Sequence, residues 1–471
     1  MLPMVKNYQI FPSVVPADTE VEMTVVPTEK AFLLVEGRTY EITVIDVDGD
    51  EPNYHDASVS RTVSATATGG VLRFRETFAG EGEHLLLLKI GEKKFEELSI
   101  YSLESDLYAL RPLRGDFHAH SFRSDGRRDP AALAGHFREQ GYDFFALTDH
   151  NRFYPGGEID ETYKDLHLSF SRVRGEEVHA PGSVIHIIHV GGDSSVADLY
   201  VKDREGYEAA IEDYLTRVPA NVPEEFRDRY ARSMWVTDRI HERNGLAIFP
   251  HPFWVPGGSR MHNVRVEYAE LLLRSGMFDG YELIGGMTQG ENNHSVAMWN
   301  DLRADGLKIS VVGSSDVHGI QGDGTFPNYF TVCFAEKNEN DAIIAAVKQG
   351  NCVAVEAVGA NYGRQYRCYG QRRLVSYAQF LFRHYFPHLQ RMAAGEGVMM
   401  RTYAMGFCDG AIVEGLAEQT RRYGDEFFGA QPPRCPSRET LDFEDKWRAV
   451  HLDGPISKGS LVYTDKVNRQ I

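Results

Sequence analysis

The sequence predicts an α/β protein: an N-terminal antiparallel β-sandwich, then a barrel or doubly wound sheet, then a mostly helical extension. Three changes in pattern along the 471 residues predict this order. Strand patterns separated by turn clusters fill residues 1–110, helix and strand patterns alternate over residues 111–358, and the alternation stops in residues 359–471. We take these three ranges as the predicted domains, in agreement with a prior of about 150 residues per domain.

The N-terminal range contains four clear strand patterns. Residues 20–27, 38–47, 70–78 and 83–90 are β-branched or alternate between apolar and polar residues, and turn clusters rich in Gly and Asp separate them. Few helical patterns interrupt them, which favours a small antiparallel β-sandwich. Three roles stay open for this domain: positioning a substrate, supporting a homo-oligomer, or covering the barrel.

The middle range alternates helices with strands. Its first helix is expected to begin after an N-cap at Asp129, with Pro130 at the first helical position and Gly141 past its end. Further helix–Gly–strand patterns predict parallel strands joined by crossover helices; they occupy residues 231–250, 265–284, 294–313 and 339–358. The polar, acidic insertion at residues 191–231 is expected to be helical with loops and to act as a lid.

Composition excludes several classes of protein. The formal charge of −18 argues against a general nucleic-acid-binding protein. No apolar run is long enough to span a membrane, and the start lacks a secretory pattern. The five cysteines are odd in number and unpatterned, which indicates free thiols and a cytoplasmic location. The Arg- and Tyr-rich residues 362–373 are assigned to packing or an oligomer contact in preference to nucleic-acid stacking.

Histidines are concentrated in the middle range, which holds 13 of the 18 between His118 and His318. His118 and His120 stand at i and i+2, so on a strand both point to one face, as two ligands of one metal require. Asp125 follows in a Ser-Asp-Gly turn. The same i, i+2 spacing recurs in Asp316 and His318 after another apolar strand.

Other strand ends carry the same residue types. Between these two pairs, apolar strand patterns end at or near several further donors: Asp149, His150, Glu176, Glu177, His179, His186, His189 and His251. In parallel α/β architectures the carboxyl ends of strands are where sites are assembled. Imidazole and carboxylate ligands suit Zn, Mn or Fe. The donors are too many for one tetrahedral ion, so we predict a multinuclear centre that hydrolyses a substrate with a metal-bound hydroxide.

At these residues the chain resembles the PHP (polymerase and histidinol phosphatase) family. The motifs that carry the resemblance occur in the family's order over about 200 residues: His-x-His with Ser-Asp-Gly, Thr-Asp-His, Gly-x-Glu, His-Pro and Gly-Ser-(Ser)-Asp-x-His. The resemblance covers about residues 112–358. It implies a distorted seven-stranded (β/α) barrel with two or three divalent metal ions at the C-terminal face of the barrel.

The resemblance also implies a ligand set. A first metal would be held by His118, His120, Glu177 and Asp316. Glu177 would bridge to a second metal held by His186 and His251. Asp125, His150 and His318 would hold a third.

Two positions in this set leave alternatives open. His186 and His189 are both available after Gly-x-Glu, and we prefer His186. Glu177 is preferred over Glu176 because of its spacing from Gly175. Asp149 is expected to orient a ligand histidine rather than to bind metal.

These residues predict a metal-dependent phosphoesterase that acts on a small phosphomonoester or phosphodiester. Asp316, His318 and Glu177 are the expected catalytic residues. Arg152 and Arg260 follow strand ends and are the expected phosphate-binding residues. The alternative is an amidohydrolase or carboxylic esterase with the same metal site.

Overall fold

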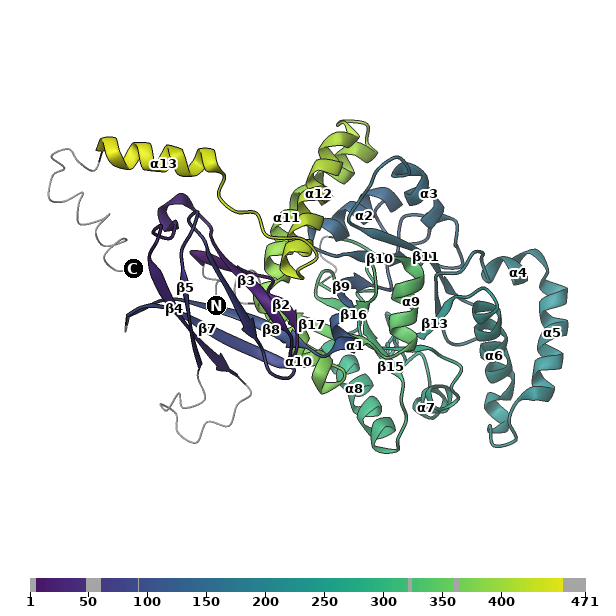
Figure 1. The fold of residues 1–471 in the computed structure, drawn as a ribbon. Helices are drawn as coiled ribbons and strands as arrows, with labels where there is room; N and C mark the ends of the chain where they lie inside the picture. The colour runs from purple at the N-terminus through teal and green to yellow at the C-terminus, as the bar shows by residue number, and fades with distance from the viewer. Residues whose placement is uncertain (1–5, 48–60, 92, 321–323, 360–363, 452–471) are drawn as a thin grey trace. The chain divides into compact units, whose positions relative to one another are not determined.

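The computed structural model describes residues 6–47, 61–91, 93–320, 324–359 and 364–451 (Figure 1). The chain divides into two compact units. One comprises residues 1–109, 383–385 and 421–471, and the other residues 110–382 and 386–420. The C-terminal range that was predicted as a separate extension therefore contributes residues to both units.

The first unit contains two sheets around one hydrophobic core. The smaller sheet has the order β1 (Tyr8–Phe11), β3 (Glu20–Pro27), β6 (Leu72–Thr77), and the larger has the order β2 (Val14–Pro16), β8 (Lys93–Leu103), β7 (Gly82–Ile90), β4 (Thr39–Asp46), β5 (Arg61–Thr66). All four strands predicted from the sequence are present, because each buries alternate apolar side chains. Met23 and Phe74 of the smaller sheet share a core with Ile42 and Leu86 of the larger.

Three further elements of the first unit are helical. They are η1 (Lys30–Phe32), α1 (Ser105–Tyr108) and α13 (Arg438–His451).

The second unit is built on one ten-stranded sheet. Its order is β15 (Ser310–Gly313), β14 (Gly280–Ile284), β13 (Leu246–Phe249), β12 (Ile187–Val190), β11 (Ser171–Val178), β10 (Phe144–Leu147), β9 (Arg111–Asp116), β16 (Tyr329–Ala335), β17 (Cys352–Val358), β18 (Gln365–Tyr369). The unit is therefore a mixed α/β structure, as the alternating patterns predicted.

A contact between strands that are far apart in this order curls the sheet into a barrel-like form. The backbone N–H of Gly313 on β15 donates to Oγ1 of Thr331 on β16 (3.0 Å), and that hydroxyl donates back to the carbonyl of Gly313 (2.8 Å). A side chain at position 313 would lie 2.6 Å from the carbonyl of Phe330. Glycine is required here because the two backbones approach so closely.

The helix–strand alternation predicted parallel strands throughout, but some of the strands are antiparallel. β12 is antiparallel to both β11 and β13, and β16 is antiparallel to β9 and β17. The link between β11 and β12 spans residues 179–186. A parallel crossover needs about a dozen residues or more, so this link can only form a reversal.

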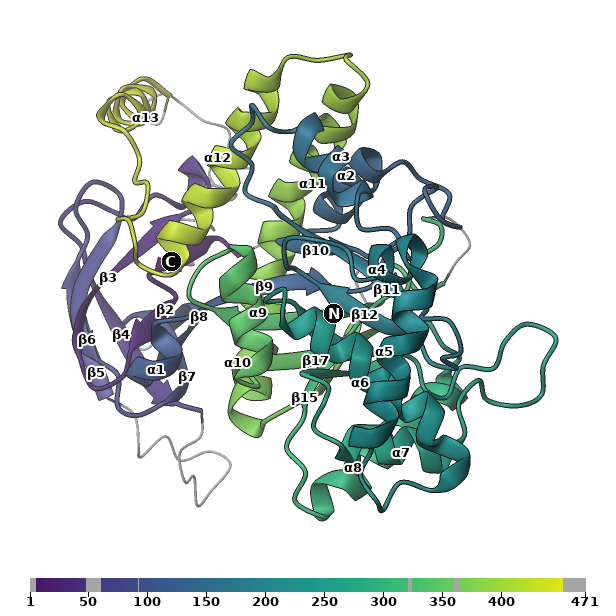
Figure 2. The ribbon, with the colours of Figure 1, turned by 90° about the vertical axis from the view of Figure 1, so that its right-hand side faces the viewer.

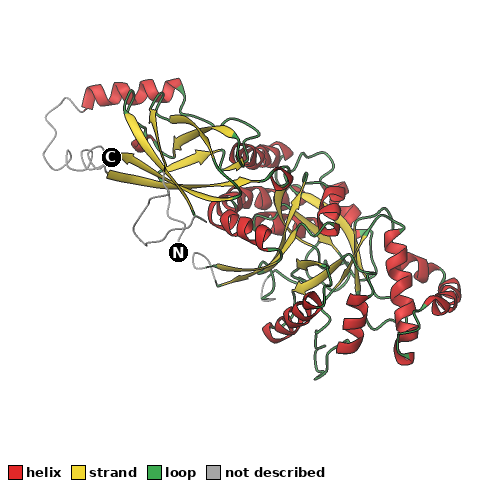
Figure 3. Ribbon diagram, turned by 60° about the horizontal axis from the view of Figure 1, so that its bottom comes forward, coloured by secondary structure: helices red, strands yellow, loops and turns green. Residues whose placement is uncertain are grey.

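Helices lie outside the strands of the second unit (Figure 3). The predicted first helix is confirmed: α2 (Pro130–Glu139) has Pro130 at its first turn, and Asp129 accepts from the backbone N–H of Ala132 (2.8 Å). The remaining helices are α3 (Pro155–Thr162), α4 (Ala197–Lys202), α5 (Arg204–Arg217), η2 (Glu224–Phe226), α6 (Arg227–His241), α7 (Val266–Arg274), α8 (Gln289–Ala304), α9 (Asn340–Lys348), α10 (Arg372–His384), α11 (Phe386–Ala404) and α12 (Gly410–Phe427), the last ends of α10 and α12 belonging to the first unit.

The insertion is helical, as expected, and it forms part of the core. Tyr207, Ile211 and Tyr214 of α5 are buried in the same cluster as Phe249 and Tyr281 of the sheet. The Arg- and Tyr-rich segment contributes β18 at the edge of the sheet, where Tyr366 stacks on Phe382 at 4.1 Å between ring centroids. Among the described residues, no helix combines the length and the apolar character needed to cross a membrane.

A buried ion pair joins α2 to α11, which lie side by side (Figure 2). Nε of Arg138 lies 2.8 Å from a carboxylate oxygen of Glu396, and both side chains are fully buried. Ser169 donates to the same carboxylate, and the guanidinium also donates to the carbonyl of Tyr142 (2.8 Å). Glu396 is therefore the nearest counter-ion of Arg138, whose Nη1 also lies 3.5 Å from Oδ1 of Asp143.

We predict that Glu396→Gln destabilises the second unit by about 3–5 kcal/mol, because it removes the nearest counter-ion of the buried Arg138 charge and leaves only the longer contact with Asp143 (3.5 Å). The free energy of unfolding in urea is the measurement. Glu161→Gln is the matched control, since its pair with Lys164 is exposed and contributes about 0–1 kcal/mol. Equal stabilities for the two variants would show that the buried pair is not needed.

Candidate metal centre

Two strand ends bring the i, i+2 pairs together. His118 and His120 follow β9, while Asp316 and His318 follow β15. The backbone N–H of His120 donates to the carbonyl of Val317 (2.9 Å), which holds the two segments side by side. As a result, Nε2 of His118 and Nε2 of His120 each lie 3.1 Å from Oδ1 of Asp316.

The carboxylate of Glu177, at the end of β11, is the centre of the cluster and is 1% exposed. Ring nitrogens of six histidines surround it, at 2.7 Å (His186), 2.8 Å (His150), 3.2 Å (His251), 3.4 Å (His118 and His120) and 3.8 Å (His179). A carboxylate has about four lone-pair sites, so it cannot serve six rings as a hydrogen-bond acceptor. The arrangement suits cations shared between the carboxylate and the rings.

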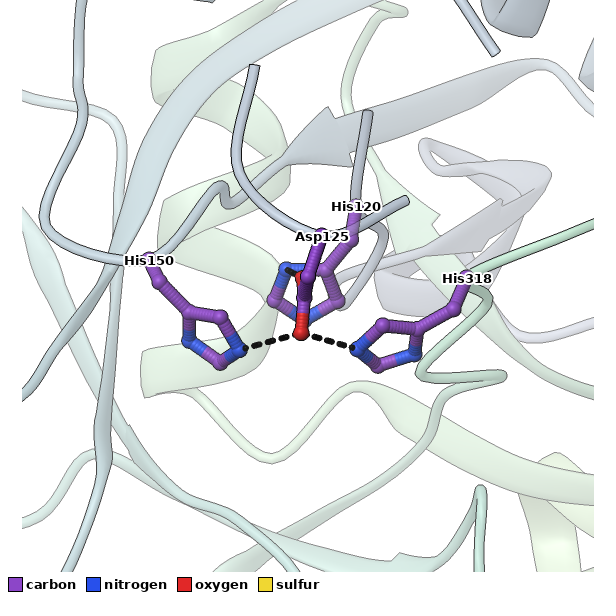
Figure 4. Close-up of side chains that lie close together, drawn as sticks. All are labelled: His120, Asp125, His150 and His318. Carbon is purple, nitrogen blue, oxygen red and sulfur yellow. Dashed lines mark ion pairs between the residues drawn. The ribbon is translucent and has the colours of Figure 1, made fainter. Parts of the chain in front are cut away.

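A second carboxylate organises the outer part of the cluster (Figure 4). Oδ2 of Asp125 lies 3.3 Å from Nε2 of His150 and 3.3 Å from Nε2 of His318, and His120 completes the group. The side chain of Asp125 is about half exposed. Burial raises the pKa of Asp125, but the neighbouring histidines outweigh it and lower the pKa below its usual range.

Two residues of the cluster have strained backbones. His251 has φ of 26° and Asp316 has φ of 50°, in the left-handed region that residues other than glycine rarely adopt. Such strain persists only where the surroundings enforce it, and it is concentrated at functional sites. Both side chains contribute donor atoms to the cluster.

The donor atoms of the cluster are suited to binding metal ions. Among the described residues, buried ring nitrogens of His118, His120, His150, His179 and His186 make no hydrogen bond, and neither does Oδ1 of Asp316. Buried polar atoms are nearly always satisfied, so a group of unsatisfied donors and acceptors facing one another needs an explanation. Imidazole and carboxylate are the ligands that Zn, Mn and Fe accept.

The electrostatics favour positive charge at the centre. Burial disfavours a charge on His118, yet Asp316, Glu177 and Glu282 raise its pKa well above the ordinary value. Burial raises the pKa of Glu177, but His118 and His186 lower it well below its usual range. Burial lowers the pKa of His186 to about 4, so this ring stays neutral near pH 7 and can act as a ligand.

All nine metal-ligating candidates of the sequence analysis lie within groups of donor atoms that approach one another to within 4.8 Å. Between the alternatives, the structure brings His186 and Glu177 into the cluster. His189 and Glu176 lie on the other face of their strands, where Nδ1 of His189 is 3.2 Å from Oε1 of Glu176. Adjacent residues of a strand point to opposite faces, which explains the separation of the two glutamates.

Two residues of the cluster were missed. His179 was counted among the donors near strand ends but left out of the expected ligand set; its ring stacks on that of His186 (3.6 Å) and it groups with His150 and Glu177. The signal was present, because Glu177 and His179 repeat the i, i+2 spacing. Glu282, fully buried on β14, lies 3.0 Å from Nδ1 of His118; nothing in its local sequence indicated this role.

The expected role of Asp149 is wrong. It accepts from the backbone N–H and the hydroxyl of Ser121 (2.8 and 2.6 Å) and from the hydroxyl of Ser124 (2.6 Å). Asp149 therefore holds the loop that carries Asp125, while Glu282 is the carboxylate that orients a histidine. The two arginines expected to bind phosphate, Arg152 and Arg260, are exposed and make no ion pair within the described residues.

We predict that Glu282→Gln weakens metal binding about 10- to 100-fold, because a carboxylate behind a ligand histidine holds its ring and its proton in place. Metal affinity is measured by competition with a chromophoric chelator. Glu356→Gln is the control, since Glu356 is also buried but pairs with Arg367. An unchanged affinity in Glu282→Gln would contradict the role.

No family model matches the sequence. The DNA polymerase/3'-5' exonuclease PolX of Bacillus subtilis is 33% identical over 94 residues, which is 19% of this chain and only 16% of that protein. A two-domain protein of Bacteroides vulgatus, described as containing a predicted PHP-like metal-dependent phosphoesterase, is 17% identical and has a TM-score of 0.37; the match covers 56% of this chain and 76% of that one.

An amidohydrolase of Chromobacterium violaceum with bound sulfate is 18% identical with a TM-score of 0.30, covering 44% of this chain and 89% of that one. Both TM-scores are below 0.5, so neither superposition supports an inference about this site. The chain is thus similar to a polymerase/exonuclease over a short segment and to two metal-dependent hydrolase structures, one of which is described as PHP-like.

Proposed function

We propose that the protein is a metal-dependent hydrolase, and more specifically a phosphoesterase that acts on a small phosphorylated substrate. One observation carries the proposal: around a buried carboxylate, Glu177, ring nitrogens of five histidines make no hydrogen bond within the described part of the chain. Buried polar atoms without partners destabilise a protein, and bound cations would satisfy them. Because part of the cluster is exposed, such cations could act on a substrate.

The proposed ligands fall into three groups. His118, His120, Asp316 and Glu177 form the first; Glu177, His186 and His251 form the second; Asp125, His150, His318 and His120 form the third. We propose two or three divalent ions, Zn, Mn or Fe, in these groups. When bound, such ions lower the pKa of a water and polarise an ester oxygen. His179 lies beside the second group and is proposed as a further ligand or support.

Among these residues we assign the catalytic roles to Glu177, Asp316 and His318. The two carboxylates keep the centre anionic, because the neighbouring charges lower the pKa of each. Nδ1 of His318 lies 2.9 Å from the carbonyl of Asp316 and can donate to it, which orients the ring. Its side chain is 37% exposed, against 26% for His150, so we assign His318 the contact with the leaving group.

The finer features of the fold belong to the same proposal. We take the second unit as a distorted seven-stranded (β/α) barrel of the PHP type, and the two N-terminal sheets as a β-sandwich. We also propose that the insertion at residues 191–231 acts as a lid, and a link to the cluster supports this. The hydroxyl of Tyr200 on α4 donates to Oδ1 of Asn151 (2.6 Å), which also accepts from the backbone N–H of His179 (2.7 Å).

The proposed activity is tested with the purified, metal-loaded protein on a panel of phosphomonoesters, phosphodiesters, carboxylic esters and amides. We expect hydrolysis of a phosphate ester, and a loss of about 100-fold or more in kcat for His118→Ala, the scale of one group that stabilises developing charge. Removal of metal by a chelator should abolish the activity and re-addition should restore it. Activity on carboxylic esters or amides alone would select the alternative amidohydrolase or esterase.

A second experiment tests the phosphate-binding arginines. Arg260→Gln and Arg152→Gln should each lower kcat/KM for the phosphate ester about 10- to 100-fold, because a hydrogen bond between charged groups contributes about 1.5–3 kcal/mol. Arg204→Gln is the control, since Arg204 is an exposed arginine that pairs with Glu208. Wild-type kinetics in both variants would remove these two arginines from the substrate site.

A further inference from the structure

A cavity of about 400 Å³ lies at the end of the sheet away from the metal cluster. Its wall includes Ser310 and Cys352, the first residues of β15 and β17. Asp316 of the cluster follows the opposite end of β15. Volumes of roughly 300–1,000 Å³ are typical of small-molecule sites, and the proposed catalytic chemistry makes no use of this one.

The charge of the lining is of one sign. Arg303, Lys308 and Lys348 contribute to the wall, and none of the described lining residues is an Asp or Glu. Within the described part of the chain none of these three cations forms an ion pair: the guanidinium of Arg303 lies over the ring of Trp299 (4.5 Å), and Nζ of Lys348 donates to the carbonyl of Gly245 (3.1 Å). Three uncompensated cations around one cavity are notable in a chain of net charge −18.

The helix dipole explains the position of only two of these three cations. Arg303 and Lys348 stand in the last turns of α8 and α9, where a cation stabilises the helix dipole. Lys308 belongs to no helix. The cavity also reaches Gln371, directly before the first turn of α10, whose N-terminal dipole favours an anion.

Apolar side chains complete the wall. Leu307, Ile309 and Val311 line the cavity together with Trp299. A bare inorganic anion would leave this apolar surface without a partner. The lining therefore matches a ligand that has both an anionic head and an apolar body.

We propose that this cavity binds a small organic phosphate or phosphonate, at a site separate from the metal cluster. The anionic head meets Arg303, Lys308 and Lys348, and the apolar body lies against Leu307 and Ile309. The site does not depend on the proposed hydrolase activity, because it shares no residue with the metal cluster.

The test uses phenylphosphonate, whose carbon–phosphorus bond resists hydrolysis, titrated calorimetrically into the full-length metal-loaded protein. Because the metals can bind the phosphonate as well, two variants separate the sites. Lys308→Gln/Lys348→Gln should weaken phenylphosphonate binding at the cavity at least about tenfold, since it removes charge-assisted contacts. The same variant should leave ester hydrolysis unchanged. His118→Ala should retain phenylphosphonate binding at the cavity.

Lys164→Gln/Lys202→Gln is the matched control, because it removes two lysine charges that lie on the exposed surface elsewhere. Thermal unfolding of each variant checks that it folds. Methylphosphonate should bind about tenfold more weakly than phenylphosphonate, the scale of burying a phenyl group. Wild-type affinity in the double variant, loss of all binding in a folded His118→Ala protein, or equal affinity for the two phosphonates would each overturn the proposal.

Discussion

The second unit depends on one electrostatic constraint: a carboxylate with almost no access to water must be neutralised. Glu177 is held at the end of a central strand, and desolvation of its charge would be costly if nothing opposed it. Six histidines from four chain segments supply the opposing groups. Ring nitrogens of five of these histidines make no hydrogen bond within the described residues, so hydrogen bonds do not satisfy the cluster. Cations shared among the rings and carboxylates resolve both the charge and the missing hydrogen bonds.

An outer set of carboxylates holds the cluster in shape. Asp116 accepts from the backbone N–H groups of His118 (3.0 Å) and Ser315 (3.1 Å), which joins the two segments that carry the i, i+2 pairs. Burial raises the pKa of Asp116 to about 7. Glu282 orients His118 and Asp149 holds the Ser-Asp-Gly loop. His251 and Asp316 keep positive φ angles within this arrangement.

Sequence reasoning worked where local chemistry decides the outcome. An N-cap and a proline determine where α2 begins, and alternating apolar residues determine the strands of the first unit. Spacing along a strand determines which side chains share a face, so the two His/Asp pairs were recognisable. The same spacing relates His179 to Glu177, and the structure places both in the cluster. The apolar periodicity of a strand does not depend on its direction, so it did not reveal the antiparallel strands; the short link between β11 and β12 was a local indication.

The sequence by itself determined the composition of the centre: which residue types stand at strand ends, and in what order along the chain. Only the tertiary structure decided which of them meet. Glu177 rather than Glu176 faces the cluster because β11 is paired in one register, and a shift by one residue would exchange their faces. Glu282 reaches His118 across 164 residues of chain because β9 and β14 belong to one curled sheet. Such contacts between distant strands arise from closure of the sheet, which no local pattern of residues encodes.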